Sequence, residues 1–187
     1  MKNRKEQIIK LAVEKIQEMG YMNFSYDDLS KELQVTKASI HYHFEKKEDL
    51  GLAVCSHLRE GLEELADELN HSSIQVKDRP YAFILRRMQH ISSTGICPVT
   101  AFQADMNELT NDLQEEVKRL SQLEAFSMVE LLRDAKNEGA IQGTTKEDLE
   151  DLSWLLLSTI KGGLQYKRAI NETVLEKILG QVRLLLK

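Results

Sequence analysis

The segment from Ser25 to Phe44, SYDDLSKELQVTKASIHYHF, constrains the fold more than any other part of the chain. It reads as two short helices joined by a tight turn, because Ser25 and Thr36 are each suited to begin a helix. A serine or threonine in that place accepts a hydrogen bond from a backbone N–H that has no partner within the helix. Two helices this short are expected to bury their apolar faces against each other.

Each of the two helices has one apolar face. Leu29 and Leu33 are four residues apart in the first helix, and Ile40 and Phe44 have the same spacing in the second. Since successive residues of a helix turn by about 100°, the remaining side chains of the second helix face outward. They are Ala38, Ser39 and Tyr42, flanked by Lys37, His41 and His43. Small, polar and basic groups on such a helix are typical of a helix-turn-helix that reads the major groove of DNA.

The pattern F-S-x-x-x-L-S-x-x-L-x-V-T-K-A-S-I-H-Y-H-F-x-x-K-x-x-L, from Phe24 to Leu50, resembles the DNA-binding domain of the TetR family of bacterial transcriptional regulators. It covers most of the first fifty residues, and beyond it the resemblance rests on the number and order of helices. One position departs from the family, which usually has glycine in the turn where Gln34 stands. A left-handed backbone is often needed there, and it costs a residue with a side chain about 1 kcal/mol.

The apolar spacing along the rest of the chain predicts an all-α fold of about nine helices. We expect them near residues 4–19, 25–33, 36–44, 47–70, 80–93, 100–109, 111–137, 145–170 and 171–186. Thr145 and Asp148 have the spacing of a capping box for the eighth helix. The resemblance implies that residues 1–47 form a three-helix DNA-binding domain, and that residues 48–187 form an effector-binding and dimerisation domain.

The charge is distributed unevenly along the chain. The formal net charge of the whole is −5, but the first 47 residues hold 9 lysines and arginines against 7 acidic residues, a net of +2. Attraction to phosphate depends on charge within about 10 Å. The acidity of the whole chain therefore does not argue against a nucleic-acid partner.

The sequence also bears on the compartment. No apolar run approaches the roughly 20 residues of a membrane span, and Trp154–Leu157 is the core of the most apolar stretch. The first ten residues are charged, unlike a secretory leader. Cys55 and Cys97 are the only cysteines, so a disulfide framework is not indicated. We expect a cytoplasmic protein without membrane association.

The resemblance implies a set of DNA contacts: Ser25, Tyr26, Thr36, Lys37, Ala38, Ser39, His41, Tyr42, His43 and Lys47. We expect Thr36, Tyr42 and Lys47 to bind phosphates, and Lys37, Ala38, Ser39 and His41 to lie nearest base edges. Lys47 is unfavourable for the dipole at the beginning of the next helix, unless it helps to hold a phosphate there. The alternative is a solvated lysine. Lys2, Arg4 and Lys5 could also touch the DNA backbone or simply be solvated.

Two C-terminal helices, 149–170 and the last one, are apolar over most of their circumference. One face of each can serve the protomer's own core, and the remainder needs a partner. By resemblance, we expect a homodimer through a four-helix bundle, with a palindromic operator. The expected interface comprises Leu156, Ile160, Gly163, Leu164, Leu175, Ile178, Leu179 and Val182. A purely intrachain core is the alternative.

A small-molecule effector is expected to bind in the C-terminal domain. The candidate lining residues are Tyr81, Met88, Cys97, Phe102, Met106, Phe126 and Trp154, since aromatic and methionine side chains line adaptable apolar cavities. For most of them plain core packing is the alternative. Cys97 could line the pocket, pack inertly or sense oxidants. Few charges fall within these stretches, which favours a lipophilic ligand.

The sequence contains no motif that indicates catalysis. No phosphate-binding loop, dinucleotide fingerprint or nucleophile elbow is present. His41 and His43 diverge on a helix and cannot easily share a metal ion, so we expect no metal and no cofactor. We interpret the chain as a ligand-responsive transcriptional regulator that acts as a repressor. The rivals are a helical protein-interaction module without DNA binding and a helical enzyme with Cys97 as nucleophile.

Overall fold

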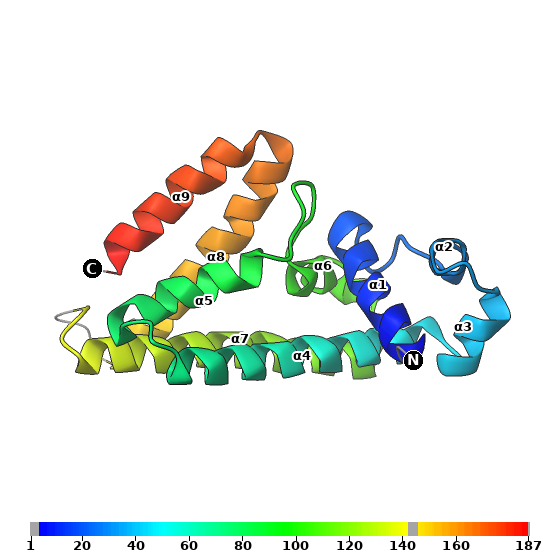
Figure 1. Ribbon diagram of the computed structural model, residues 1–187, viewed down its shortest axis with the longest axis horizontal. Helices are drawn as coiled ribbons and strands as arrows, with labels where there is room; N and C mark the ends of the chain where they lie inside the picture. The colour runs from blue at the N-terminus through cyan, green and yellow to red at the C-terminus, as the bar shows by residue number, and fades with distance from the viewer. Residues whose placement is uncertain (1–3, 142–145, 187) are drawn as a thin grey trace. The chain divides into compact units, whose positions relative to one another are not determined.

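The computed structural model describes residues 4–141 and 146–186, with the backbone alone at residues 146 and 147. This part of the chain contains nine α-helices (Figure 1), which confirms the all-α prediction. The helices are α1 (Arg4–Met19), α2 (Tyr26–Glu32), α3 (Lys37–His43), α4 (Lys47–His71), α5 (Arg79–Met88), α6 (Pro98–Ala104), α7 (Asn111–Asn137), α8 (Lys146–Ala169) and α9 (Glu172–Leu185), with short 3-10 helices η1 (Val76–Asp78) and η2 (Met106–Glu108).

The helices form two compact units. The first unit comprises the chain up to Glu60 together with Pro98–Leu120, and the second comprises Gly61–Cys97 together with the chain from Ser121 onward. The first unit therefore contains more than the expected DNA-binding segment 1–47. The functional boundary at residue 47 stays a prediction.

Two helices end earlier than expected. Helix α5 stops at Met88 instead of Ser93, and the chain continues in turns closed by hydrogen bonds from Gln89 N to Arg86 O and from Ile91 N to Met88 O. The following Ser-Ser-Thr run favours turns over helix. Helix α6 stops at Ala104, and η2 takes the place of its expected last turn. The capping role of Thr145 and the DNA contact of Lys2 lie outside the described residues.

The local signals for the helix-turn-helix are confirmed. Ser25 caps α2 in a reciprocal capping box with Asp28, and Thr36 Oγ1 accepts a hydrogen bond from Ser39 N at 3.2 Å to cap α3. Between the helices Gln34 has φ +54°. This is the left-handed conformation for which the turn would favour glycine.

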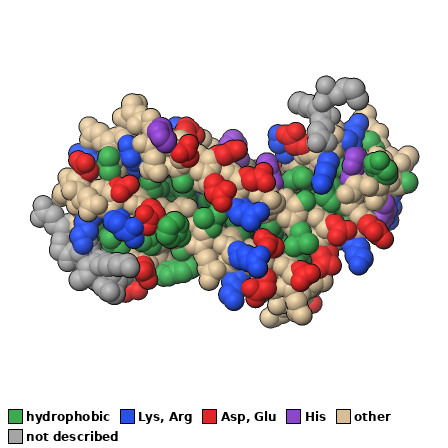
Figure 2. Space-filling model, turned by 90° about the horizontal axis from the view of Figure 1, so that it is seen from below, with side chains coloured by type: hydrophobic (Ala, Val, Ile, Leu, Met, Phe, Trp, Pro, Cys, Tyr) green, Lys and Arg blue, Asp and Glu red, His purple; other side chains and the backbone are tan. Residues whose placement is uncertain are grey.

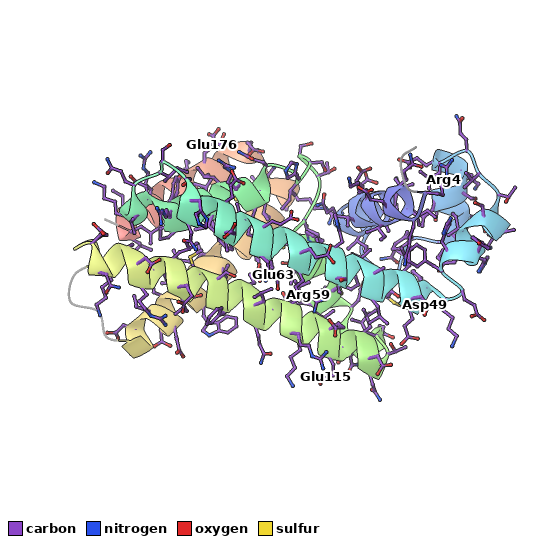
Figure 3. All side chains as sticks on the ribbon, turned by 60° about the horizontal axis from the view of Figure 1, so that its bottom comes forward. Arg4, Asp49, Arg59, Glu63, Glu115 and Glu176 are labelled. Carbon is purple, nitrogen blue, oxygen red and sulfur yellow. The ribbon has the colours of Figure 1, made fainter. Side chains whose placement is uncertain are left out.

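The first unit holds the segment between α1 and α2 from several sides. Met22 N donates to Asp105 Oδ2 at 3.0 Å, and the ring of Tyr21 lies 5.0 Å from that of Phe102 in α6. The Tyr21 hydroxyl donates to Lys47 O at the beginning of α4. That end of α4, where Asp49 is labelled in Figure 3, is capped by a hydrogen bond from Lys46 N to Asp49 Oδ2.

In the second unit α8 and α9 form a helical hairpin (Figure 1). Gly163 allows the close approach, because a Cβ there would lie 3.1 Å from Leu175 and 3.2 Å from Ile178. Ser153 Oγ joins α8 to α7 by donating to Ala125 O at 3.1 Å. Among the described residues, no helix is long and apolar enough to cross a membrane.

Candidate nucleic-acid interface and interior cavity

Helix α3 has one buried side and one exposed side, as its sequence predicts. Ile40 and Phe44 expose 0% and 3% of their surface, whereas Tyr42 exposes 86%. Lys37, Ala38 and His41 are exposed, and Ser39 and His43 are half-buried. The core of the first unit thus fixes α3 from within, and its outer side is available to a partner.

The polar groups of this outer side make only light contacts within the protein. Lys37 Nζ lies 3.0 Å from Asp27 Oδ2 in an ion pair whose side chains are both about half exposed. His41 Nδ1 lies 3.2 Å from Glu45 O, and the rings of Tyr42 and His43 meet edge to face. An exposed pair of this kind is worth less than about 1 kcal/mol. Lys37 can therefore exchange Asp27 for another partner at little cost.

Tyr26 lies in the core, which corrects its expected place on the DNA-facing surface. It is 6% exposed, and its hydroxyl proton is shared between Phe44 O at 3.0 Å and Lys46 O at 2.6 Å. Burial raises the pKa of Tyr26 to about 12. The residue holds the end of α3 instead of presenting its hydroxyl outward.

Lys47 is also tied into the protein. Its Nζ donates to Phe24 O at 2.6 Å and to Met22 O at 3.2 Å, and lies over the rings of Tyr21 and Phe24 at 4.9 and 4.5 Å. Burial lowers the pKa of Lys47. It is therefore neither a simple solvated lysine nor a side chain reserved for phosphate. An ammonium group has three N–H donors, and two are directed at these carbonyls.

The charge around α3 is mixed. Figure 2 shows, on one face of the molecule, lysine, arginine and histidine side chains interspersed with acidic ones. In the described residues no cluster of three His, Cys, Asp or Glu side chains is suited to a metal ion.

A cavity of about 30 Å³ lies in the second unit between α5, α7 and α8 and is partly open to the surface. Three ionisable side chains from three helices line it, Arg87 of α5, Glu124 of α7 and Lys161 of α8, which we call the charged trio. Its other lining residues are Phe83, Ile84, Met88, Ile91, Cys97, Leu157, Ile160 and Leu164. A larger groove of about 480 Å³, on the first unit between α1 and the end of α2, is open and lined mainly by polar and charged side chains.

The members of the charged trio are paired with one another, with Glu124 buried and Arg87 and Lys161 half-buried. Glu124 exposes 2% of its side chain, Arg87 19% and Lys161 17%. Glu124 Oε1 contacts Arg87 Nη1, and Oε2 lies 2.5 Å from Lys161 Nζ. Burial alone would raise the pKa of Glu124, but the two cations outweigh burial and hold it below its ordinary value. The carboxylate is therefore charged at neutral pH.

The residues expected to line an effector pocket do not come together. Met88 and Cys97 line the cavity, whereas Phe102 and Met106 belong to the first unit. Tyr81 lies elsewhere in the second unit, with the Arg183 guanidinium 5.5 Å from its ring. Phe126 and Trp154 are 61% and 51% exposed. Aromatic content alone did not distinguish an interior face from an exterior one.

The charged trio was not predicted from the sequence, although one signal was present. The apolar stripe of α7 passes through Leu113, Val117, Leu120, Met128 and Leu131, and Glu124 stands on the same stripe. A carboxylate at a buried helical position requires a cationic partner. The spacing could thus have indicated a charged interior, although not which cations complete it.

Most residues expected at a dimer interface lie inside the protomer instead. Leu156, Ile160, Gly163, Leu164, Leu175 and Val182 are buried in the single chain, and Ile178 and Leu179 are half-buried. Packing of α8 on α9 accounts for part of this burial, and Ile160 and Leu164 also line the cavity together with side chains of α5 and α7. The apolar side chains that α8, α9 and their connection leave exposed are Trp154, Leu155, Tyr166, Ile170, Leu184 and Leu185. Gly162 and Gly180 have open space around them.

The sequence and fold resemble known regulators. Residues 8–54 match the N-terminal pattern of the bacterial regulatory proteins of the tetR family. A TetR transcriptional regulator from Legionella pneumophila is 29% identical, with a TM-score of 0.87 over 100% of this chain and 99% of that one. A TetR-family regulator from Agrobacterium tumefaciens is 22% identical, with a TM-score of 0.86 over 98% and 95%.

A further relative is the negative transcriptional regulator IcaR of the icaADBC biofilm operon of Staphylococcus aureus. It is 23% identical over 158 residues, which are 83% of this chain and 81% of IcaR. Together with the helix-turn-helix geometry, these likenesses define a DNA-binding protein. Residues 8–54 thus have the DNA-binding pattern of the TetR family of bacterial transcriptional regulators, and the fold of the whole chain is that of solved TetR-family regulators.

Proposed function

We propose that this protein is a dimeric repressor that binds a palindromic operator and releases it when a small molecule enters the second unit. The observation that carries the proposal is the two-sided character of α3, with Ile40 buried and Tyr42 exposed. The outer side of α3 suits the major groove in size and polarity. IcaR, a relative over most of the chain, is named as a negative regulator, which favours repression.

The proposed contacts divide into two kinds. Thr36, Tyr42 and Lys47 contact phosphates, while Lys37, Ala38, Ser39 and His41 lie nearest base edges, with Ser25 and His43 at the margin. Lys47 contributes only its remaining donor, since two donors already hold the segment between α1 and α2. Phosphate contacts set affinity for any DNA, and base contacts set sequence preference.

A binding experiment tests this division. Lys37→Ala and Ser39→Ala should alter the preferred sequence selected from random duplexes, whereas Lys47→Met should weaken binding to all duplexes and reduce the salt slope by about one unit. Lys118→Met on α7, also an exposed lysine, serves as the control. If the α3 variants weaken binding to all duplexes equally, Lys37 and Ser39 do not read the base sequence. If Lys47→Met leaves the salt slope unchanged, Lys47 has a purely structural role.

The dimer is proposed to form through the outer sides of α8 and α9. Their exposed apolar residues, including Leu155, Tyr166 and Leu184, need a cover, and the space around Gly162 and Gly180 permits helices of a second copy to approach closely. A twofold dimer places two α3 helices about 34 Å apart on one face of DNA.

Sedimentation at micromolar concentration tests the dimer. The wild-type protein should sediment as a dimer, and Leu184→Glu should sediment as a folded monomer with weakened operator binding. Leu85→Glu, at an exposed leucine of α5, should remain dimeric. A monomeric wild-type protein would overturn the proposed assembly.

A further inference from the structure

The charged trio carries an imbalance of charge. Arg87 and Lys161 supply two positive charges and Glu124 one negative charge, and the other lining residues of the cavity are apolar side chains and the Cys97 thiol. Burying charges without a full complement of opposite charge is costly. Among the residues that line the cavity, one further negative charge would balance the two cations.

We propose that the charged trio recognises a small carboxylate with an apolar tail, whose carboxylate binds Arg87 and Lys161 beside Glu124. This inference rests on the proposed effector function and names the chemical class of the effector. The tail would lie among the apolar lining residues, such as Ile84, Met88 and Leu157. It replaces the expectation of a purely lipophilic ligand.

The chemistry of the trio favours a monoanion over the alternatives. A neutral molecule leaves the excess positive charge in place, and an amine increases it. A doubly charged phosphate reverses the imbalance instead of removing it. Arginine has a planar fork of donors that matches a carboxylate in a two-point contact, and the tail fits the predominantly apolar remainder of the lining.

The ligand must rearrange the cavity. A volume of about 30 Å³ is too small for an organic molecule of several heavy atoms. The side chains that line the cavity must therefore move apart when the ligand binds. Arg87 now contacts Glu124, and its Nη2 lies 3.9 Å from Cys97 Sγ. Turning the guanidinium toward a ligand loosens both contacts. Cys97 directly precedes Pro98, where α6 begins. A ligand that binds only the rearranged cavity favours that arrangement over the present one, and release of DNA requires a difference in affinity of this kind.

A set of ligands that differ only in charge tests the proposal on the unmodified full chain. Hexanoate, hexanamide and hexylamine are compared at neutral pH by calorimetry and thermal unfolding, with butyrate and decanoate to vary the tail. We expect the carboxylate of the fitting length to bind roughly tenfold tighter than its amide, and the amine not to bind. Equal or tighter binding of the amide or amine, or no binding by any of the carboxylates, would overturn the proposal.

Two variants that keep side-chain size sharpen the test. Lys161→Gln should abolish the preference for the carboxylate over the amide, and Glu124→Gln should tighten carboxylate binding roughly tenfold because it removes the competing anion. The control is Arg86→Gln on α5, whose partner is the exposed Glu68; it should bind hexanoate like the wild type. A Lys161→Gln protein that folds and keeps the full preference would contradict the site. The wild-type comparison decides the matter if either variant does not fold.

Failure of this inference is distinguishable from failure of the proposed function. Mobility shift with operator DNA and no ligand tests the regulator alone. If the amide binds as tightly as the carboxylate while the operator is still bound, the carboxylate site fails and the repressor stands. If hexanoate binds with the expected preference but leaves the operator bound, the site stands and its effector role fails.

Discussion

The outer side of α3 and the charged trio place polar groups in opposite surroundings. On α3, Lys37 and Tyr42 face water, and their contacts with the rest of the protein are few. In the second unit Glu124 is almost fully buried between two cations. Water screens the first group and is largely excluded from the second, so the same kinds of side chain interact much more strongly in the interior.

This difference separates binding from stability. A substitution on the outer side of α3 changes what the protein binds while leaving the fold intact, because the lost side chain supports nothing beneath it. A substitution in the charged trio changes both properties together. A ligand that exchanges partners within the trio therefore acts directly on the free energy of the fold, which a contact on α3 does not.

The largest expected effect is on the stability of the second unit. Glu124→Ala leaves Arg87 and Lys161 without their shared carboxylate, and should lower the free energy of unfolding by about 3–5 kcal/mol. Glu130→Ala on the same helix breaks a more exposed pair with Arg133 and should cost less than about 1 kcal/mol. Denaturant unfolding measures both. Equal effects would remove the contrast between buried and exposed charges.

An intermediate effect is expected on acidification. The cations hold the pKa of Glu124 below its ordinary value of 4.5 despite its burial. Its ion pairs therefore contribute stability that is fully present above that value and is lost as the pH falls through the lower pKa of the folded state. Below pH 4.5, the thermal unfolding temperature of the wild type should thus fall more steeply with decreasing pH than that of Glu124→Gln. Parallel curves would show that the carboxylate is not held ionised.

The smallest expected effect lies in the turn before α3. Gln34→Gly should raise the free energy of unfolding by about 1 kcal/mol, because glycine adopts the observed φ of +54° without steric cost. Gln122→Gly, at an exposed position inside α7, should lower it by about the same amount. Chemical denaturation distinguishes the two signs. A loss of stability in Gln34→Gly would mean that the glutamine side chain has its own stabilising role.

The sequence predicted local features well. Caps at Ser25 and Thr36, the inward direction of Ile40 and Phe44, and the left-handed turn at Gln34 each depend on residues a few positions apart. Helix periodicity and capping rules act over that same distance. The helix-turn-helix was therefore predictable nearly in full. The exception is Tyr26, which was expected on the DNA-facing surface and packs in the core.

Features that depend on distant residues were not predictable in the same way. Arg87, Glu124 and Lys161 are separated by 37 residues at each step and meet only through the packing of three helices. The dimer prediction illustrates the same limit, because a helix that is apolar nearly all round does not indicate which side faces its own core. Gly163 proved to serve the protomer's own hairpin, while Gly162 has open space beside it.

The hydroxyl of Tyr26 has a consequence for the thermodynamics of association. By bonding to Phe44 O and Lys46 O it ties the start of α2 to the end of α3, so the helix that we propose to read DNA is preorganised before it meets a duplex. Little ordering entropy then remains to oppose complex formation in this part of the protein. The heat capacity change on binding an operator should accordingly reflect apolar surface removed from water, without a contribution from coupled folding.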